Sequence, residues 1–358
     1  MVKHLRLKRP TVVETVLGIA LGAVAIVAIL ATAIGYVPHT QKYPYIPAVN
    51  AIGVSAERLA PGEATTPGSR IPSIPVLSWH QIDNGCQPTS LQCSSPEYSE
   101  TNVTQLQFYN ELSWLYSHGY RTITTAQYVK WATSQDVMLP AKPVLLTVDD
   151  GIANFYGPAT PILEHFGYTM VSFVVSGYAQ GAQDGVPENE GWDATWTQLQ
   201  NLPPGTWEFA FHAGPHGHEI LANDSCPYFY VCPKHGKFAA FKASVKADIN
   251  AGIAAEQQQL GSRVNTQMWA VPFNDLAQPS GGPHSGGAKT GKWLQAYAAK
   301  KFAVVFVDGQ VSQANQHYRY EVHGADTLAF FAQQVQESSY YTSDPSPATA
   351  NARAGGQN

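Results

Sequence analysis

The chain has 358 residues, which is enough for one large domain or two small ones, and 44% of them are hydrophobic, as in a globular protein. Charged residues make up only 13%, well below the roughly 25% usual for soluble domains, and the formal net charge is −5. Because no basic stretch follows the first ten residues, this composition argues against a nucleic-acid partner.

The N-terminus combines a cationic flank with a long apolar run. MVKHLRLKRP carries the positive charges, and the uncharged segment Val16–Val37 is long enough to cross a hydrocarbon core of roughly 30 Å. We expect residues 1–37 to form a cytoplasmic flank and a transmembrane anchor, with the remaining chain outside the cytoplasm. Ala31–Ala33 also fits a signal-peptide cleavage site, and cleavage there would make the protein secreted.

Composition divides the rest of the chain into three parts. Residues 38–70 are rich in Pro, Ala, Gly and Thr, which is typical of a flexible linker between a membrane and a domain. Residues 343–358 are small and polar, and we expect a disordered tail. The folded domain is therefore expected to span residues 71–342.

Four cysteines form two local pairs, Cys86 with Cys93 and Cys226 with Cys232. Their spacings differ from the C-x-x-C of a zinc ribbon. Two short-loop disulfides would suit an exported domain, although four cysteines permit three pairings and the sequence does not choose among them.

Between the linker and the tail, strand-like apolar runs alternate with helical patterns. In chain order we expect a strand at 74–82, a helix at 104–120, a strand at 144–148, a helix at 158–166, a strand at 168–177, a helix at 196–202, a strand at 207–212, a helix at 237–260, a strand at 266–273, a helix at 292–301 and a strand at 302–309. This alternation predicts parallel strands covered by helices, in an α/β domain or a (β/α) barrel. In such folds catalytic groups gather at the carboxyl ends of the strands.

Side chains with acid–base and metal-binding chemistry follow these predicted strands. They are His80, Asp149, Asp150, His212, His216 and His218. Two imidazoles and a carboxylate are the ligand set of a catalytic zinc site with one position left for water. One aspartate can bind a metal while its neighbour acts as a base, and the cation would relieve the repulsion between them. The simpler interpretation is an Asp-Gly turn with separate, hydrogen-bonded histidines.

Between about Ile71 and Val335 the chain resembles the polysaccharide deacetylase family, carbohydrate esterase family 4. LLTVDDG is similar to the family's T-F-D-D-G, HAGPH to its H-(S/T)-x-x-H, and WAVPFND to its hydrophobic-x-P-Y-G segment. With VLSWHQI before the acids, the order of motifs resembles the branch acting on poly-β-1,6-N-acetylglucosamine. The resemblance implies a distorted or incomplete (β/α) barrel. It also implies metal-dependent hydrolysis of N-acetyl groups from an extracellular or cell-wall N-acetylhexosamine polysaccharide.

The resemblance further implies a role for each catalytic residue. Asp149 matches the general base, and His80 matches the acid that protonates the departing amine. The backbone N–H of Phe273 matches the donor that stabilises the oxyanion. Asn274 replaces the family's glycine, and asparagine is among the residues that best tolerate a left-handed backbone.

Asp150, His212 and a second histidine match the ligands of one divalent metal ion, for which Zn²⁺ is the expected identity. His216 has the spacing of the wider family and is slightly preferred as the second histidine. The resembled branch places this ligand one residue later, which falls on Gly217, so His218 competes with His216.

Some departures from the family pattern favour other functions. Ala213 stands where Ser or Thr is usual, which removes a local hydrogen bond that would stiffen the metal-binding loop. A catalytically weakened carbohydrate-binding or scaffold protein with the same fold is therefore one alternative. A deacetylase acting on peptidoglycan or on a small amide is another. Four tryptophans could stack on sugar rings or pack in the core, namely Trp79, Trp192, Trp196 and Trp269.

Overall fold

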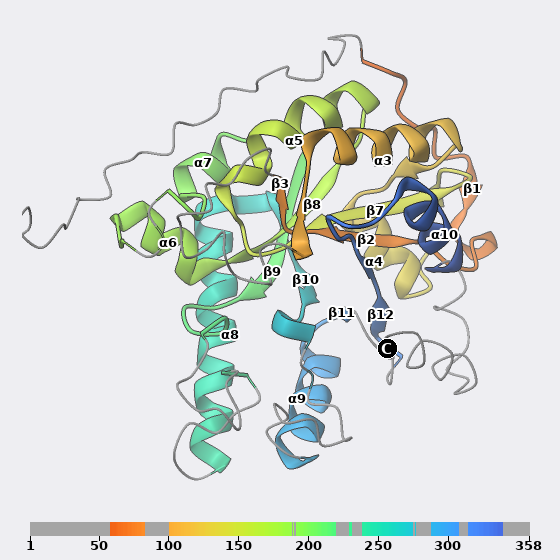
Figure 1. Cartoon of the computed structure of the whole chain (residues 1–358). Coiled ribbons are helices and arrows are strands. Elements are labelled where there is room, and N and C mark those ends of the chain that lie inside the picture. Colours follow the sequence, from red (N-terminus) through yellow and green to blue (C-terminus); the bar gives the residue numbers. More distant parts are fainter. Residues whose placement is uncertain are drawn as a thin grey trace, which may run out of the picture. The chain divides into compact units, whose positions relative to one another are not determined.

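Parallel strands form the centre of the described part of the molecule (Figure 1). The computed structural model describes residues 58–82, 100–187, 189, 191–219, 229–230, 238–274, 276, 288–307 and 314–338. Within these ranges nine strands form one sheet, eight of them in the order β12-β11-β10-β9-β8-β7-β2-β13, with β5 beside β7. Their bounds are β2 Val76–Trp79, β5 Arg121–Thr122, β7 Pro143–Val148, β8 Met170–Val175, β9 Trp207–Ala213, β10 Val264–Ala270, β11 Val304–Val307, β12 Gln316–Tyr318 and β13 Tyr320–Glu321.

One continuous stretch of chain joins the two edges of this sheet. β12 pairs with β11, β13 pairs with β2, and Arg319 alone separates β12 from β13. The backbone N–H of Arg319 donates to Val307 O, and that of Val322 donates to Ser78 O. The sheet is thereby nearly closed into a barrel with flanking helices, which confirms the predicted (β/α) barrel of distorted or incomplete form.

Threonine caps define where several of the helices begin. The Oγ1 atoms of Thr104, Thr124 and Thr195 each accept the backbone N–H of the residue three positions later, and the last two form full capping boxes. The helices α3 and α5 pack side by side on one face (Figure 1). The helix bounds are α3 Gln105–Ser117, α4 Thr125–Ala132, α5 Ala153–Phe166, α6 Ser176–Asp184, α7 Trp196–Gln200, α8 Phe238–Leu260, α9 Ala288–Lys301 and α10 Leu328–Ser338.

Shorter elements lie outside the main sheet. β1 Thr66–Pro67 pairs with β6 Met138–Leu139, and β3 Gln81–Ile82 pairs with β4 Asn102–Val103. The described residues also include three single-turn 3₁₀ helices, η1 Gly68–Arg70, η2 Gly261–Arg263 and η3 Pro272–Asn274.

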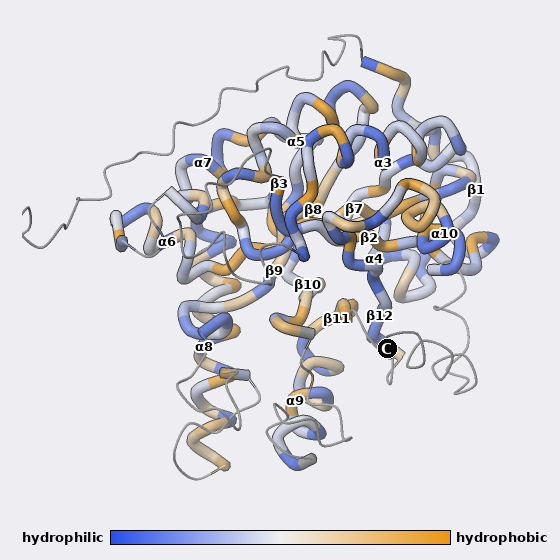
Figure 2. Tube along the Cα trace, viewed as in Figure 1, coloured by the Kyte–Doolittle hydropathy of each residue, from blue (hydrophilic) through white to orange (hydrophobic). Residues whose placement is uncertain are grey.

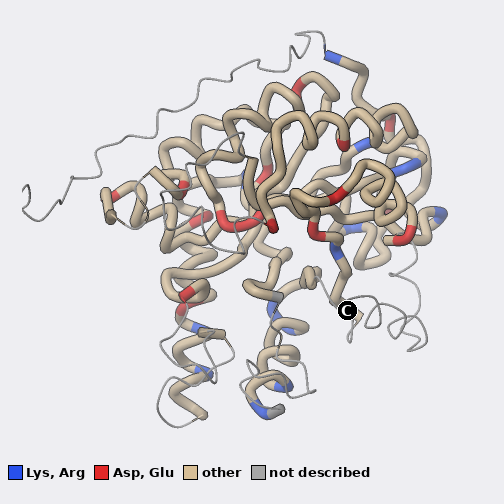
Figure 3. The backbone as a smooth tube through the Cα atoms, in the orientation of Figure 1, with Lys and Arg blue, Asp and Glu red and all other residues tan. Residues whose placement is uncertain are grey.

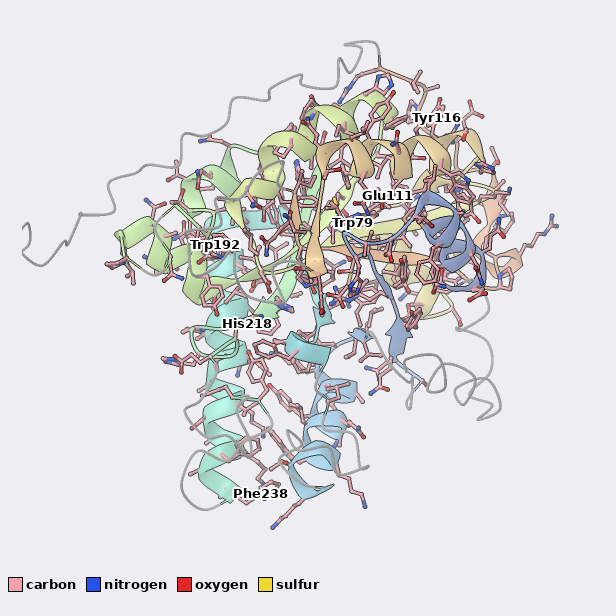
Figure 4. The ribbon with its side chains drawn as sticks, in the orientation of Figure 1. Trp79, Glu111, Tyr116, Trp192, His218 and Phe238 are labelled. Carbon is pink, nitrogen blue, oxygen red and sulfur yellow. The ribbon has the colours of Figure 1, made fainter. Side chains whose placement is uncertain are left out.

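The central strands are buried on both faces. Every residue of β7 and β8 is buried, as expected for parallel strands with helices on one face and a barrel interior on the other. Hydrophobic residues are accordingly prominent along these strands (Figure 2). Trp79, Trp196 and Trp269 are buried in this core, so the sugar-stacking role considered for them is wrong. Trp192 is partly exposed (Figure 4).

The folded domain begins before Ile71, the residue at which the sequence placed its start. The backbone N–H of Leu59 donates to His165 O at 2.7 Å, and that of Gly68 donates to Val137 O at 2.7 Å. A free linker would satisfy these groups with water. Residues 59–70 therefore belong to the domain rather than to a linker.

Several sequence expectations lie outside the described residues. They are the apolar segment at 16–37, the linker before residue 58, the tail at 343–358, and both cysteine pairs, Cys86 with Cys93 and Cys226 with Cys232. Among the helices in the ranges given above, none has the length and apolar character needed to cross a membrane.

Candidate metal centre and catalytic site

Most of the predicted site residues converge because they follow parallel strands. His80 follows β2, the acids Asp149 and Asp150 follow β7, His212 lies in β9, and Phe273 follows β10. The carboxyl ends of parallel strands meet at one end of a barrel. Acidic residues gather near the middle of the view in Figure 3, whereas lysines mark α8 and α9.

The acid pair ends β7 in a turn that separates the two carboxylates. The backbone N–H of Asp149 still donates to Trp79 O of β2 at 3.0 Å, so Asp149 remains in the strand ladder. Asp150 and Gly151 then have φ of 67° and 84°, in the left-handed region. Asp is among the few non-glycine residues that adopt this conformation readily. The Asp-Gly turn is therefore real, and it also allows the two acids to have different neighbours.

Asp150, His212 and His218 form a possible metal site. One ligand atom from each lies within 4.8 Å of the others. The Nε2 atoms of His212 and His218 lie 3.2 Å and 3.1 Å from Asp150 Oδ1. That carboxylate oxygen is buried and has no hydrogen-bond partner among the described residues. Figure 4 labels His218 beside α8.

Hydrogen bonds on the far side of each ring orient the two imidazoles. His212 Nδ1 lies 2.7 Å from the Ala270 carbonyl oxygen, so this nitrogen must donate its proton. The Tyr178 hydroxyl donates to the His218 carbonyl at 3.2 Å, and its oxygen lies 3.1 Å from His218 Nδ1, which must then donate to it. In the neutral rings both Nε2 lone pairs therefore face Asp150 Oδ1. These three atoms, one carboxylate oxygen and two imidazole nitrogens, all offer lone pairs and would be satisfied by a cation. Such a set of ligand atoms suits Zn²⁺.

His216, the histidine that the sequence slightly preferred, does not lie in this cluster. Its side chain is 61% exposed, and its Nδ1 lies 2.6 Å from Glu219 Oε1. The cause is the path of the loop at Gly217, where a Cβ atom would overlap the Tyr230 hydroxyl. The chain turns at this glycine and carries His218, rather than His216, to Asp150.

Asp149 is paired with Arg319, a residue that the sequence interpretation missed. Arg319 Nη1 donates to Asp149 Oδ1 at 2.7 Å, and Nη2 donates to Oδ2, between two buried side chains. Burial alone would raise the pKa of Asp149, but the Arg319 guanidinium, together with His212 and His80, more than offsets this effect and the pKa is lowered. Asp149 is therefore ionised at neutral pH. The signal available in the sequence was weak: a single arginine between Tyr318 and Tyr320.

His80 lies between two acids. Its Nε2 is 3.9 Å from Asp149 Oδ2, and its Nδ1 is 3.4 Å from Oε1 of Glu321, a second residue missed from the sequence. Burial lowers the pKa of His80, but the charges of Asp150, Asp149 and Glu321 outweigh this and the pKa is raised. The protonated form of His80 is thus favoured, which suits an acid.

Phe273 has an unusual backbone conformation. Its φ of 55° lies in the left-handed region, which a bulky residue rarely adopts and which often marks functional sites. Phe273 rather than Asn274 is therefore the residue that takes the left-handed conformation in this segment. Its ring centroid lies 4.3 Å from that of His218, so η3 borders the possible metal site. Its role as an oxyanion donor stays a prediction.

Comparison with known proteins places this site in context. No family model matches the chain. YxkH of Bacillus subtilis, assigned as a polysaccharide deacetylase, is 28% identical over 102 residues, which cover 28% of this chain and 32% of YxkH. The poly-β-1,6-N-acetyl-D-glucosamine N-deacetylase of Escherichia coli K12 is 25% identical over 155 residues, or 41% of this chain and 22% of that protein. The matches thus span a third or less of these relatives.

A solved structure shares the fold. The de-N-acetylase from Aggregatibacter actinomycetemcomitans superposes with a TM-score of 0.55 at 17% identity, over 73% of this chain and 99% of that one. At this identity the superposition shows the fold alone. The curated relatives confirm that this chain resembles the polysaccharide deacetylase family and its poly-β-1,6-N-acetylglucosamine deacetylase branch.

Proposed function

We propose that this chain is a metal-dependent deacetylase that removes N-acetyl groups from an N-acetylhexosamine polysaccharide. One observation carries the proposal: two adjacent aspartates have complementary surroundings. Asp150 faces two imidazole nitrogens, whereas Asp149 is held ionised by Arg319 beside His80. The names of the partial relatives support the substrate class.

Asp150, His212 and His218 are the residues that would hold the ion. A divalent cation, expected to be Zn²⁺, would polarise the acetamide carbonyl and lower the pKa of water. His212 and His218 are oriented for this by their Nδ1 bonds, so little rearrangement of the rings is needed.

Asp149 would act as the general base. Its carboxylate takes a proton from the water that attacks the acetyl carbon, and Arg319 keeps it ionised before the reaction. Because this carboxylate is already hydrogen-bonded by the guanidinium, its orientation is fixed in advance.

His80 would act as the general acid. The C–N bond breaks only if the nitrogen leaves as an amine, and protonated His80 supplies that proton. The products are acetate and a free amino sugar. The backbone N–H of Phe273 would donate to the oxyanion, an interaction worth about 3 kcal/mol where such donors have been removed.

The proposal includes a location outside the cytoplasm. The cationic first ten residues and the apolar run at 16–37 support either an anchor or a cleaved signal peptide. The substrate would then be an extracellular or cell-wall polymer.

The test is acetate release from β-1,6-linked N-acetylglucosamine oligomers by the zinc-loaded protein. Chelation should abolish it and Asp149→Asn should lower it roughly 10²–10⁴-fold, and activity that survives both changes undiminished would refute the mechanism. Peptidoglycan fragments and N-acetylglucosamine in the same assay test the other substrates. A protein that binds one zinc but releases acetate from none of them would be a scaffold instead.

A further inference from the structure

The loop at 213–218 connects His212 to His218 and has no side-chain hydroxyl, carboxyl or amide group that could accept its own backbone N–H groups. Ala213 carries no hydroxyl, and Pro215 has no backbone N–H. The backbone N–H groups of Gly214 and His216 follow the end of β9 and need acceptors of their own. The position of His218 depends on how these groups are satisfied.

Two residues outside the loop supply the acceptors. The Gly214 N–H donates to the Tyr230 hydroxyl oxygen at 3.1 Å, and the His216 N–H donates to Asp248 Oδ1 at 2.7 Å. The Tyr230 O–H in turn donates to Asp248 Oδ2 at 2.7 Å. Tyr230 and Asp248 are both buried, so water competes little with these bonds.

Glycines allow the loop to pack closely between α6 and α8. A Cβ atom on Gly252 of α8 would lie 2.7 Å from Gly214 Cα, and one on Gly177 of α6 would lie 2.6 Å from Pro215 O. A Cβ atom on Gly214 itself would overlap Asp248. The His216 N–H thus donates to Asp248 of α8 near a point where the helix backbone approaches the loop backbone.

We propose that Asp248 and Tyr230 are positioning residues that hold the loop at 213–218 so that His218 meets Asp150 and His212. They replace the loop hydrogen bond that Ala213 cannot make. This inference rests on the proposed function only in requiring that the cluster binds a metal ion, and it extends to residues that touch neither ion nor substrate.

Glu256 provides a matched control on the same helix. Like Asp248, it is a buried acid of α8, with 0% of its surface exposed against 5% for Asp248. Its carboxylate oxygens have no hydrogen-bond partner among the described residues. Replacing Glu256 perturbs α8 without removing a bond to the loop.

The experiment compares zinc affinity in the purified full chain and four variants: Tyr230→Phe, Asp248→Ala, the double variant and Glu256→Gln. Zinc dissociation constants are measured by competition with an indicator dye, and cobalt absorption spectra report the ligand geometry. We expect Tyr230→Phe and Asp248→Ala each to weaken zinc binding about 10-fold or more and to alter the cobalt spectrum. Because the two residues act as one unit, the double variant should lose less than the product of the two effects.

The zinc dissociation constant of Glu256→Gln should stay within about two-fold of that of the unmodified chain, well below the effect expected for residues that orient a ligand. Unchanged zinc affinity in Tyr230→Phe and Asp248→Ala would overturn the inference, as would an equal loss in Glu256→Gln. If Asp248→Ala does not fold, Tyr230→Phe alone decides. Because no acetate is measured, an inactive protein that shows the expected zinc pattern would refute the proposed function and leave this inference standing.

Discussion

The two halves of the site differ in how their charges are balanced. On the side of β2, β12 and β13, Asp149 is paired with Arg319, and His80 lies near Glu321. On the side of β9, three potential acceptors from Asp150, His212 and His218 face one another. In the first half each acidic side chain has a basic side chain beside it, whereas the second half has three lone pairs that would be satisfied by a cation. Changes on the first side should therefore alter the rate and its pH dependence, and changes on the second should remove the metal.

The largest effect is expected from Asp150→Ala. This change removes the only carboxylate of the cluster, and zinc affinity should fall by more than about 100-fold, beyond the usual effect of an outer residue. Acetate release should fall to background. The zinc content of Asp150→Ala and Asp149→Asn after dialysis checks this result. Equal zinc content in the two variants would contradict the assignment of metal binding to Asp150 rather than Asp149.

Asp149→Asn should uncouple catalysis from metal binding. An amide cannot accept the proton from water, so kcat should fall roughly 10²–10⁴-fold, the usual contribution of a general base. Zinc affinity should change little, because Asp149 is bonded to Arg319 rather than to the histidines. Steady-state kinetics with zinc titration measure both quantities. A loss of zinc here would show that the two halves are not separate.

Arg319→Leu should mainly affect stability and the acidic limb of the rate profile. It leaves Asp149 buried without its cation, which costs about 3–5 kcal/mol of unfolding free energy when one partner of such a pair is removed. The pKa of Asp149 should rise, because Arg319 is the main group that lowers it. As the pH is lowered, the variant should therefore begin to lose activity at a higher pH than the parent protein does. Denaturant unfolding measures the stability.

The control for this change is the double variant Arg319→Leu with Asp149→Asn. Because it removes both charges, it should lose less stability than Arg319→Leu alone. A double variant that is less stable than the single one would show that the ion pair is not the cause.

Glu321→Gln should give the smallest effect. Glu321 is one of the groups that raise the pKa of His80, so its loss should lower that pKa. The acid form of His80 is then lost at lower pH, and the alkaline limb of kcat/KM should move to lower pH. Glu164→Gln, on the surface of α5 beside Arg58, is the control. If Glu321→Gln and the parent protein have the same pH dependence of kcat/KM, Glu321 does not influence the proton donated by His80.

Much of the site could be predicted from sequence because its residues follow long apolar strands. His80, the two acids and His212 each adjoin a strand with a readable pattern, and parallel strands bring such positions together. The alternation of strands and helices predicted an α/β domain or a (β/α) barrel, and the family resemblance implied the distorted or incomplete barrel. Arg319 and Glu321 were missed because β12 and β13 have only three and two residues, too few to show a period of two.

The choice between His216 and His218 could not be made from spacing. It depends on the turn at Gly217, and that turn packs against Tyr230, thirteen residues away in the chain. Likewise, the loss of a hydroxyl at Ala213 suggested a weakened site. The loop N–H groups donate instead to Tyr230 and Asp248, whose contacts with the loop have no local sequence signature.

The most direct test is the zinc content of His218→Gln and His216→Gln, two variants that differ in the position of one imidazole by two residues. If His218 completes the cluster, the parent protein and His216→Gln should each retain one zinc ion per chain after dialysis, and His218→Gln should lose it. Retention of zinc by His218→Gln together with its loss from His216→Gln would contradict this site.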